Sequence, residues 1–260
     1  MIAIRSRRGW ASQAWPVAAA AVVFVAGWQL IVNITNYPTY ILPGPGPVLD
    51  SFLFFWGRGT IQTHAAATLT EVAFGLLVGG GAGLLIGVLL ARSALAERLL
   101  SPYIVAAQAT PILALAPLIY LWLGTGLASR VLICSLIVFF PITVSTMVGI
   151  RSVDVRLIEL AHSLRASRRQ VLREFQIPAA MPQILGGFRV GVTLAVVGAI
   201  VAEWAGADRG LGVLINLARG SLYNTPLLFA ALFTIAAIGV TLYLCVVLLE
   251  RRLVGRWRAS

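Results

Sequence analysis

Few residues of this chain could carry out acid–base or nucleophilic chemistry, and their types exclude several reactions. The sequence has two histidines, two cysteines and nine acidic residues, and all twenty of its basic residues are arginine. Without lysine the chain cannot contain a phosphate-binding loop of the GxxxxGK[ST] type, and it cannot form a Schiff base. We therefore expect it to use no cofactor and to hydrolyse no ATP by itself.

The histidines and cysteines give no reactive cluster either. His64 and His162 fall on opposite sides of the membrane in the topology given below, which excludes a shared metal site or a histidine dyad. Cys134 and Cys245 lie in apolar runs far apart in the sequence, so we expect both to be small buried hydrophobic residues. Serine and threonine in the apolar segments lack a His or Lys partner at recognisable spacing, so an intramembrane hydrolase has no support. The sequence predicts no catalytic residue and no metal site.

The most strongly charged stretch is "ELAHSLRASRRQVLREFQIPAAMP", residues 159–182. Four arginines fall within nine positions, and apolar residues recur at helical spacing on the other face. This pattern predicts an amphipathic helix that ends at Pro178. Such a helix could lie on anionic lipid, or it could present its surface to a soluble partner.

Outside this stretch the composition predicts an all-α, polytopic membrane protein. Hydrophobic residues make up 59% of the chain and charged residues 11%, compared with about 25% charged residues in soluble domains. Too little polar sequence remains to cover a soluble core. Six apolar windows, each close to the roughly 20 residues that a membrane helix needs, are expected to span the bilayer: 15–34, 70–91, 101–123, 130–149, 184–206 and 226–249.

These spans divide the chain into an N-terminal tail (1–14), a transmembrane domain (15–249) with one long loop (151–183), and a C-terminal tail (250–260). The first span has no persuasive cleavage site after it, so we expect it to be retained. Fifteen of the twenty arginines lie in the two tails and in the segments 92–98 and 151–173. Because positive loops stay inside, both termini are expected in the cytoplasm of a multi-pass plasma-membrane protein.

Glycine and proline mark two of the spans. Span two carries a glycine groove on one helix face, made by Gly75, Gly79, Gly83 and Gly87. Such a groove lets a second helix approach closely, either within the chain or across a subunit interface. Span three combines three prolines with two polar residues, Gln108 and Thr110. A helix broken at Pro111 could line a passage, or the proline could give a structural kink alone.

Glu203 stands near the outer end of span five, only fourteen positions after Arg189. About 21 Å separate the two residues on a helix, so at least one of them must lie at or inside the membrane boundary. An ionisable residue there is costly. Glu203 is therefore either an interfacial anchor beside Trp204, or a residue of an ion pair or gate on the pathway.

The loop and its surroundings resemble a known family. Glu159-Leu160-Ala161, followed by Ile177-Pro178 and Pro182, is similar to the conserved loop of ABC importer permeases. The similarity extends to "YILPGPGPVL" (40–49), "TLTEVAFGLLVGGGAGLLIGVLLARS" (68–93), "TPILALAPLIYLWLGTGLASR" (110–130), "FFPITVSTMVGIRSVD" (139–154) and "AEWAGADRGLGVLI" (202–215). Together these segments resemble the six-span permeases of the sulfonate, nitrate, taurine and pyrimidine/riboflavin importers.

The resemblance implies that Glu159, Ala161, Arg165 and Pro178 belong to a coupling helix that docks on a separate ATPase subunit. It also implies a second permease subunit, most simply a second copy of the chain, and a solute-binding protein that docks on the outer loops 35–67 and 207–225. The branch that it favours imports riboflavin or a thiamine pyrimidine precursor; a sulfonate, taurine or nitrate importer is the alternative. A membrane scaffold that recruits a cytoplasmic partner is the alternative outside transport.

One position departs from the family pattern. Arg165 occupies the place of a loop glycine, where the backbone of the family takes positive φ. An ordinary side chain disfavours that conformation by about 1 kcal/mol or more, so we expect the turn at this position to be reshaped.

Overall fold

The computed structural model describes residues 10–258, which form helices and contain no strand. Five helices are long and apolar enough to cross a membrane: α1 (Trp10–Thr35), α3 (Thr60–Arg92), α6 (Leu127–Arg151), α9 (Ile177–Gly206) and α11 (Thr225–Arg258). Helices are the expected state of such segments, because lipid offers no partner for backbone polar groups. The prediction of an all-α, polytopic fold is confirmed. Residues 1–9 of the expected N-terminal tail lie outside the described residues.

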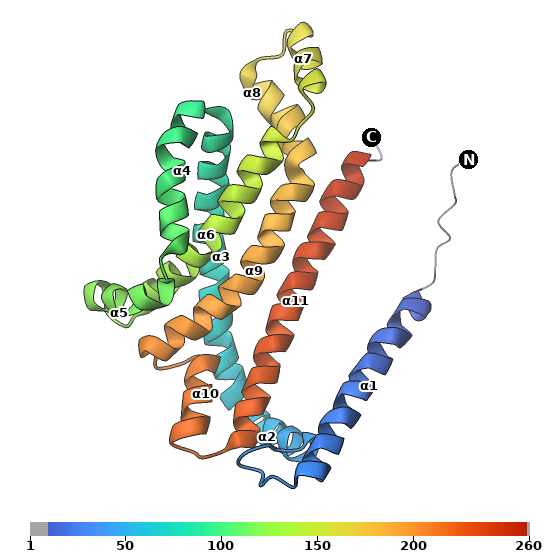
Figure 1. The fold of residues 1–260 in the computed structure, drawn as a ribbon, viewed down its shortest axis with the longest axis vertical. Helices are drawn as coiled ribbons and strands as arrows, with labels where there is room; N and C mark the ends of the chain where they lie inside the picture. Colours follow the sequence, from blue (N-terminus) through green and yellow to red (C-terminus); the bar gives the residue numbers. More distant parts are fainter. Residues whose placement is uncertain (1–9, 259–260) are drawn as a thin grey trace.

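The third expected span is divided into two shorter helices, α4 (Ala94–Ala109) and α5 (Ile112–Leu123). The break falls at Thr110 and Pro111, whose backbones are extended. Proline has no N–H to continue the helical ladder, and it disfavours helical backbone in the residue before it. Figure 1 shows that α5 turns aside from the axis of α4. The span is broken as its prolines predict.

The ends of the helix bundle differ in structure (Figure 1). One end, here called the α10 end, holds α2 (Pro45–Gly57), the start of α3 and α10 (Leu211–Gly220). The segment 35–67, expected to be a loop, is therefore largely helical. The opposite end, here called the α7 end, holds α7 (Val155–Ser163), α8 (Arg168–Gln170) and the π-helix η1 (Val171–Gln176). The elements α8, η1 and α9 form one helical run from Arg168 to Gly206.

The glycines of α3 fix how closely the central helices approach. α6 packs between α3 and α9, and Gly75, Gly79, Gly83 and Gly87 are all buried. A β-carbon placed on Gly79 would lie 2.3 Å from the backbone oxygen of Ser135 in α6. Real β-carbons do not come that close, so only glycine allows α3 and α6 this spacing. The groove is thus filled within the chain.

Apolar side chains of α3, α6 and α9 complete this contact. Val72, Val138, Ile142 and Ala195 belong to one buried cluster together with Cys134, which is fully buried and free. The expectation that both cysteines are buried is wrong for Cys245. That residue is exposed, because α11 turns much of its apolar surface away from the bundle.

Helix α1 stands apart from the bundle (Figure 1). Aromatic side chains of α1 and α11 contact each other. The Trp28 ring stacks on Phe229 of α11, with ring centres 5.9 Å apart, and contacts Phe233 at 5.6 Å. Apolar cavities of about 430 and 370 Å³ lie beside this contact. Most of the apolar surface of α1 is therefore left for lipid or another helix.

Candidate functional site

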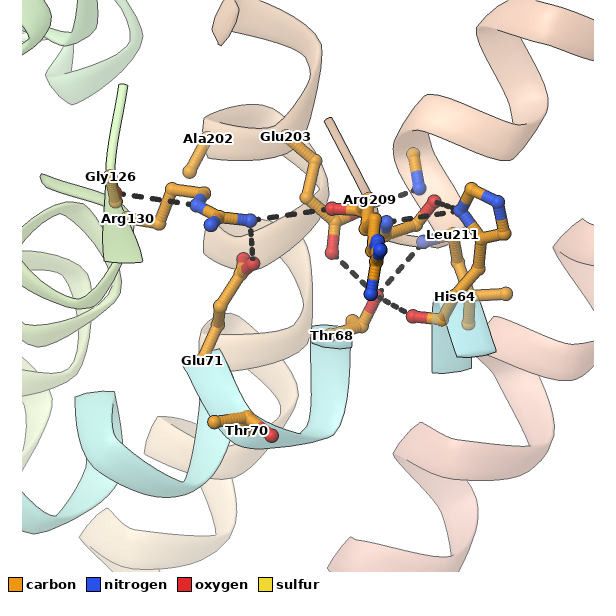
Figure 2. Close-up of polar contacts among 12 residues, drawn as sticks. His64, Thr68, Thr70, Glu71, Gly126, Arg130, Ala202, Glu203, Arg209 and Leu211 are labelled. Carbon is orange, nitrogen blue, oxygen red and sulfur yellow. Dashed lines mark hydrogen bonds and ion pairs between the residues drawn. The ribbon is translucent and has the colours of Figure 1, made fainter. Parts of the chain in front are cut away.

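A network of buried polar groups joins four elements at the α10 end (Figure 2). Its first part is an ion pair between α3 and α6, in which Arg130 Nη1 donates to Glu71 Oε1 at 2.6 Å. The same nitrogen also reaches the backbone oxygen of Arg209, at 3.3 Å, in the turn that follows α9. Arg130 thus ties α6 to both α3 and that turn.

The second part of the network is centred on Glu203, near the end of α9. Its side chain is buried, with 2% of the residue exposed. Thr68 Oγ1 donates to Glu203 Oε1 at 2.5 Å, and the Gly212 N–H donates to Oε2 at 2.5 Å. Gly212 lies in the first turn of α10, whose N–H groups have no partner inside the helix. The carboxylate therefore caps α10, where the positive end of the helix dipole favours a negative charge.

Two glycines make room for this carboxylate. Gly210 has φ of 140°, and a β-carbon there would lie 2.1 Å from Glu203 Cδ. A β-carbon on Gly212 would lie 2.9 Å from Glu203 Oε2. The backbone of the turn can wrap around the acidic group only because both positions lack a side chain.

Thr68 and His64 extend the network along α3. The Leu211 N–H donates to Thr68 Oγ1 at 2.9 Å. His64 Nδ1 lies 3.1 Å from the Gly210 nitrogen and 2.7 Å from the Gly210 oxygen. It accepts from the first when unprotonated and donates to the second when protonated. Either way, the turn before α10 is held against the first turns of α3.

The acidic side chains of the network outnumber its cation. The two buried carboxyl groups, of Glu71 and Glu203, face one guanidinium, and Glu71 Oε2 is a buried atom with no hydrogen-bond partner among the described residues. Charges at this depth are costly unless they are paired. The contacts of the arrangement position helices relative to one another. Within residues 10–258, no group of three or more His, Cys, Asp or Glu side chains could hold a metal ion.

The turn in the charged segment at the α7 end keeps its left-handed geometry, so the expectation that arginine reshapes it is wrong. Helix α7 ends in a Schellman motif, in which the Ala166 N–H donates to Ala161 O at 3.0 Å. Arg165 takes the left-handed position of that motif, with φ of 58°. A capping box of Ser167 and Gln170 then starts the next helix. The position therefore keeps glycine-like geometry although it carries arginine.

Two other expectations for this segment are wrong. The amphipathic helix does not run on to Pro178; it ends at Ser163, because the left-handed Arg165 and the cap at Ser167 interrupt it. Pro178 lies near the start of α9 instead, inside a continuous helical run. Ala161 is fully buried, so its own side chain cannot meet a partner, whereas Glu159 and Arg165 are exposed.

The remaining candidates lie apart from the network. Gln108, Thr110 and Pro111 are exposed where α4 meets α5, and none of them has a hydrogen bond to the network. Glu203 is buried, so it is not an exposed anchor beside Trp204, which is 52% exposed. Arg189 pairs with Glu250 of α11 at 3.1 Å, so α9 carries one ion pair nearer the α7 end and one buried carboxylate at the α10 end.

Sequence reasoning missed most of the network. His64, Thr68 and Glu71 are spaced four and three positions apart, which places them on one face of α3. That spacing was available in the sequence as a polar face within an otherwise apolar helix. Their partners, Arg130 and the turn at 209–212, lie far away in the chain, and no local pattern connects them to α3.

Comparisons with known proteins agree on one family. Residues 83–258 match the family described as "Binding-protein-dependent transport system inner membrane component". The chain is 43% identical to the riboflavin transport system permease protein of Chloroflexus aurantiacus, over 95% of this chain and 92% of that protein.

Two further relatives carry other names. A formylaminopyrimidine transport permease protein of Halalkalibacterium halodurans is 34% identical over 89% of this chain and 91% of its own length. A putative aliphatic sulfonates transport permease protein of Bacillus subtilis is 35% identical over 92% and 86%. Among solved structures, an inward-facing form of the MetNI methionine ABC transporter matches with a TM-score of 0.61 and 20% identity, over 72% of this chain and 91% of that chain. That likeness concerns the fold.

Proposed function

The chain belongs to the inner-membrane components of binding-protein-dependent transport systems, the permease subunits of ABC importers, and from this premise we propose that it imports riboflavin or a thiamine pyrimidine precursor. Members of this family are not enzymes, since ATP hydrolysis belongs to a separate subunit. The observation that carries the choice of solute is the 43% identity, over nearly the whole chain, to a riboflavin transport permease. The formylaminopyrimidine relative supports the second solute.

Sulfonate or taurine import is the competing function. It is supported by relatives of 35% and 33% identity that are named for aliphatic sulfonates and taurine. Riboflavin and pyrimidines are flat heterocycles, whereas taurine and alkyl sulfonates are small molecules that carry a sulfonate group. A binding protein and a pathway suited to one class would therefore serve the other poorly.

The orientation that we propose places the α7 end in the cytoplasm. Arginines at 92, 98, 151, 156, 165, 168, 169, 173, 251, 252 and 256 belong to elements that gather at that end (Figure 1). The α10 end carries Arg58, Arg130, Arg209 and Arg219. Under the positive-inside rule this asymmetry puts both termini inside. The α10 end would then receive the solute-binding protein.

We propose that α7 docks on the ATPase, with Glu159 and Arg165 exposed at its contact surface. One chain brings one such segment, so two chains would pair, most simply as a homodimer. The exposed break between α4 and α5, with Gln108, Thr110 and Pro111, is then available to face the solute pathway between the two copies.

The fold gives a direct mechanical connection between the two ends. The run from Arg168 to Gly206 has 39 residues, which is nearly 60 Å at about 1.5 Å per residue. It begins beside α7 and ends at Glu203, which caps α10. A displacement of α7 by the ATPase would therefore be carried along one helix to the polar network, which holds α3, α6 and α10 to that helix.

Growth selection can separate the two solute classes. The chain would be expressed with its matching ATPase and binding protein in a bacterium that makes no riboflavin and lacks riboflavin uptake. We expect growth at limiting riboflavin, and no growth with taurine or sulfonate as the sole sulfur source in a matched sulfur-uptake mutant. The opposite pattern would assign the chain to sulfonate import.

A further inference from the structure

A polar recess lies at the α7 end, opposite the buried network. Its volume is about 250 Å³, and it is lined by Arg92 at the end of α3, Ile158 of α7, Arg168 of α8, and Val171 and Gln176 of η1. Three chain segments that are separate in sequence thus meet around one space.

The π-helix explains how η1 contributes two residues to this wall. In an α-helix, residues five positions apart point about 140° away from each other. A π-helix bonds each residue to the one five positions away, and the Ile177 N–H indeed donates to Leu172 O. Val171 and Gln176 therefore fall on the same side. Pro178 offers a reason for the wide turn, since a proline in a regular helix clashes with the carbonyl four residues earlier.

The charge of the recess is positive and is not balanced from within the described chain. Ion pairs in residues 10–258 involve Arg130, Arg151 and Arg189. Arg92 and Arg168 have no such partner in that part of the chain, and no acidic side chain lines the recess. Two guanidinium groups that share a space repel each other unless an anion lies between them.

We infer that this recess binds a phosphate group. Guanidinium groups present a planar pair of donors that matches phosphate oxygens, and the Gln176 amide supplies a neutral donor at the same wall. The phosphate can come from the headgroup of an anionic phospholipid, since basic pockets between membrane helices bind such groups, or from a soluble phosphate compound. A bound phosphate would tie the end of α3 to α8 and η1, which follow α7 in the chain, and so would hold the proposed coupling segment in place.

The test uses the full chain in a detergent whose zwitterionic or sugar headgroup contains no phosphorus. The buffer contains no phosphate. The unfolding temperature is followed while sodium phosphate, dioctanoylphosphatidylglycerol or dioctanoylglycerol is added at constant ionic strength. A ligand that binds the folded chain raises this temperature in a saturable way. Dioctanoylglycerol lacks the phosphate and is the control for the acyl chains.

The first pair of substitutions, Arg92→Gln and Arg168→Gln, is made together in one chain. The second pair, Arg98→Gln and Arg169→Gln, is made together in another chain and is the control. The control arginines are exposed neighbours that do not line the recess, so both pairs remove the same charge. We expect phosphate, phosphatidylglycerol or both to stabilise the wild-type chain in a saturable way. The affinity for that ligand should fall about tenfold or more in the first pair and stay unchanged in the second. Stabilisation by phosphatidylglycerol alone would identify a lipid headgroup as the source, and stabilisation by free phosphate would identify a soluble one.

Three results would overturn the inference. The first is no saturable effect of either phosphate ligand on the wild-type chain. The second is an effect of equal size in both variant pairs, which would show general screening of arginine charge. The third is loss of ATPase co-purification in the first pair while wild-type chain binds no phosphate, which would assign the recess to the ATPase.

Discussion

Glu203 holds three helices together through hydrogen bonds to both oxygens of one carboxylate. It accepts from Thr68 of α3 and from Gly212 of α10 while belonging to α9 itself. Removing a buried acceptor leaves its donors unpaired, at about 1–3 kcal/mol for each group. The energetic cost of burying an acid at this depth is thus offset by specific partners.

We therefore expect Glu203→Ala to lower transport while ATPase co-purification stays at the wild-type level, because the network lies at the end opposite α7. Transport in proteoliposomes and pull-down of the ATPase measure the two effects. Asp208→Ala is the matched control, since Asp208 is an exposed acid five residues away. Equal transport by wild type, Glu203→Ala and Asp208→Ala would show that the network has no part in function.

Arg165 has a left-handed backbone conformation that favours glycine. Its φ of 58° costs about 1 kcal/mol for an ordinary side chain, and a β-branched residue tolerates this region least. Glycine removes this strain but has more freedom in the unfolded chain. We expect Arg165→Gly to be tolerated, and Arg165→Val to open the turn. Limited proteolysis at 163–168 would compare the three chains, and equal cleavage of all three would contradict the strain argument.

At the scale of elements, the approach of α3 to α6 depends on glycine at defined positions. A methyl group on Gly79 meets the Ser135 backbone, whereas one on Gly81 meets nothing within 4 Å. Overpacking typically costs about 1–3 kcal/mol, and glycine to alanine on an open helix face gains about 0.5–1 kcal/mol. We expect Gly79→Ala to lower the unfolding temperature in detergent and Gly81→Ala to preserve or raise it. The same change in both variants would mean that the two helices are not in contact at Gly79.

The segment α7 is the element that we propose to meet the ATPase. Glu159→Arg makes α7 more cationic, so a helix that lay only on anionic lipid would be held at least as well, whereas a docked helix loses a favourable contact. We expect both transport and ATPase co-purification to fall, with Asp208→Arg as the control for added charge at the opposite end.

Crosslinking locates the same contact. Single cysteines belong at the exposed Leu160 and Ser163 rather than at buried Ala161, in a chain whose exposed Cys245 is replaced by serine. We expect both positions to crosslink to the ATPase. Unchanged co-purification of Glu159→Arg, with no crosslink from α7, would remove the coupling assignment.

For the whole molecule, periodicity and composition predicted the features that depend on residues close together in the sequence. The membrane helices follow from apolar runs, and the break in span three follows from Pro111. Contacts between distant residues were beyond such reasoning. No local pattern at Arg130 points to Glu71, yet the two residues pair across 59 positions. The partner of the glycine groove could not be chosen without α6 in place.

For the molecule as a whole, we propose that two copies of the chain, driven by a separate ATPase, move a heterocyclic solute. The most direct measurement is riboflavin accumulation in proteoliposomes that contain the chain, its matching ATPase and its binding protein. We predict accumulation that requires ATP and all three proteins and that falls in the Glu159→Arg variant. Riboflavin uptake at the level of protein-free liposomes, in a system that accumulates taurine or an alkyl sulfonate on addition of ATP, would contradict the account.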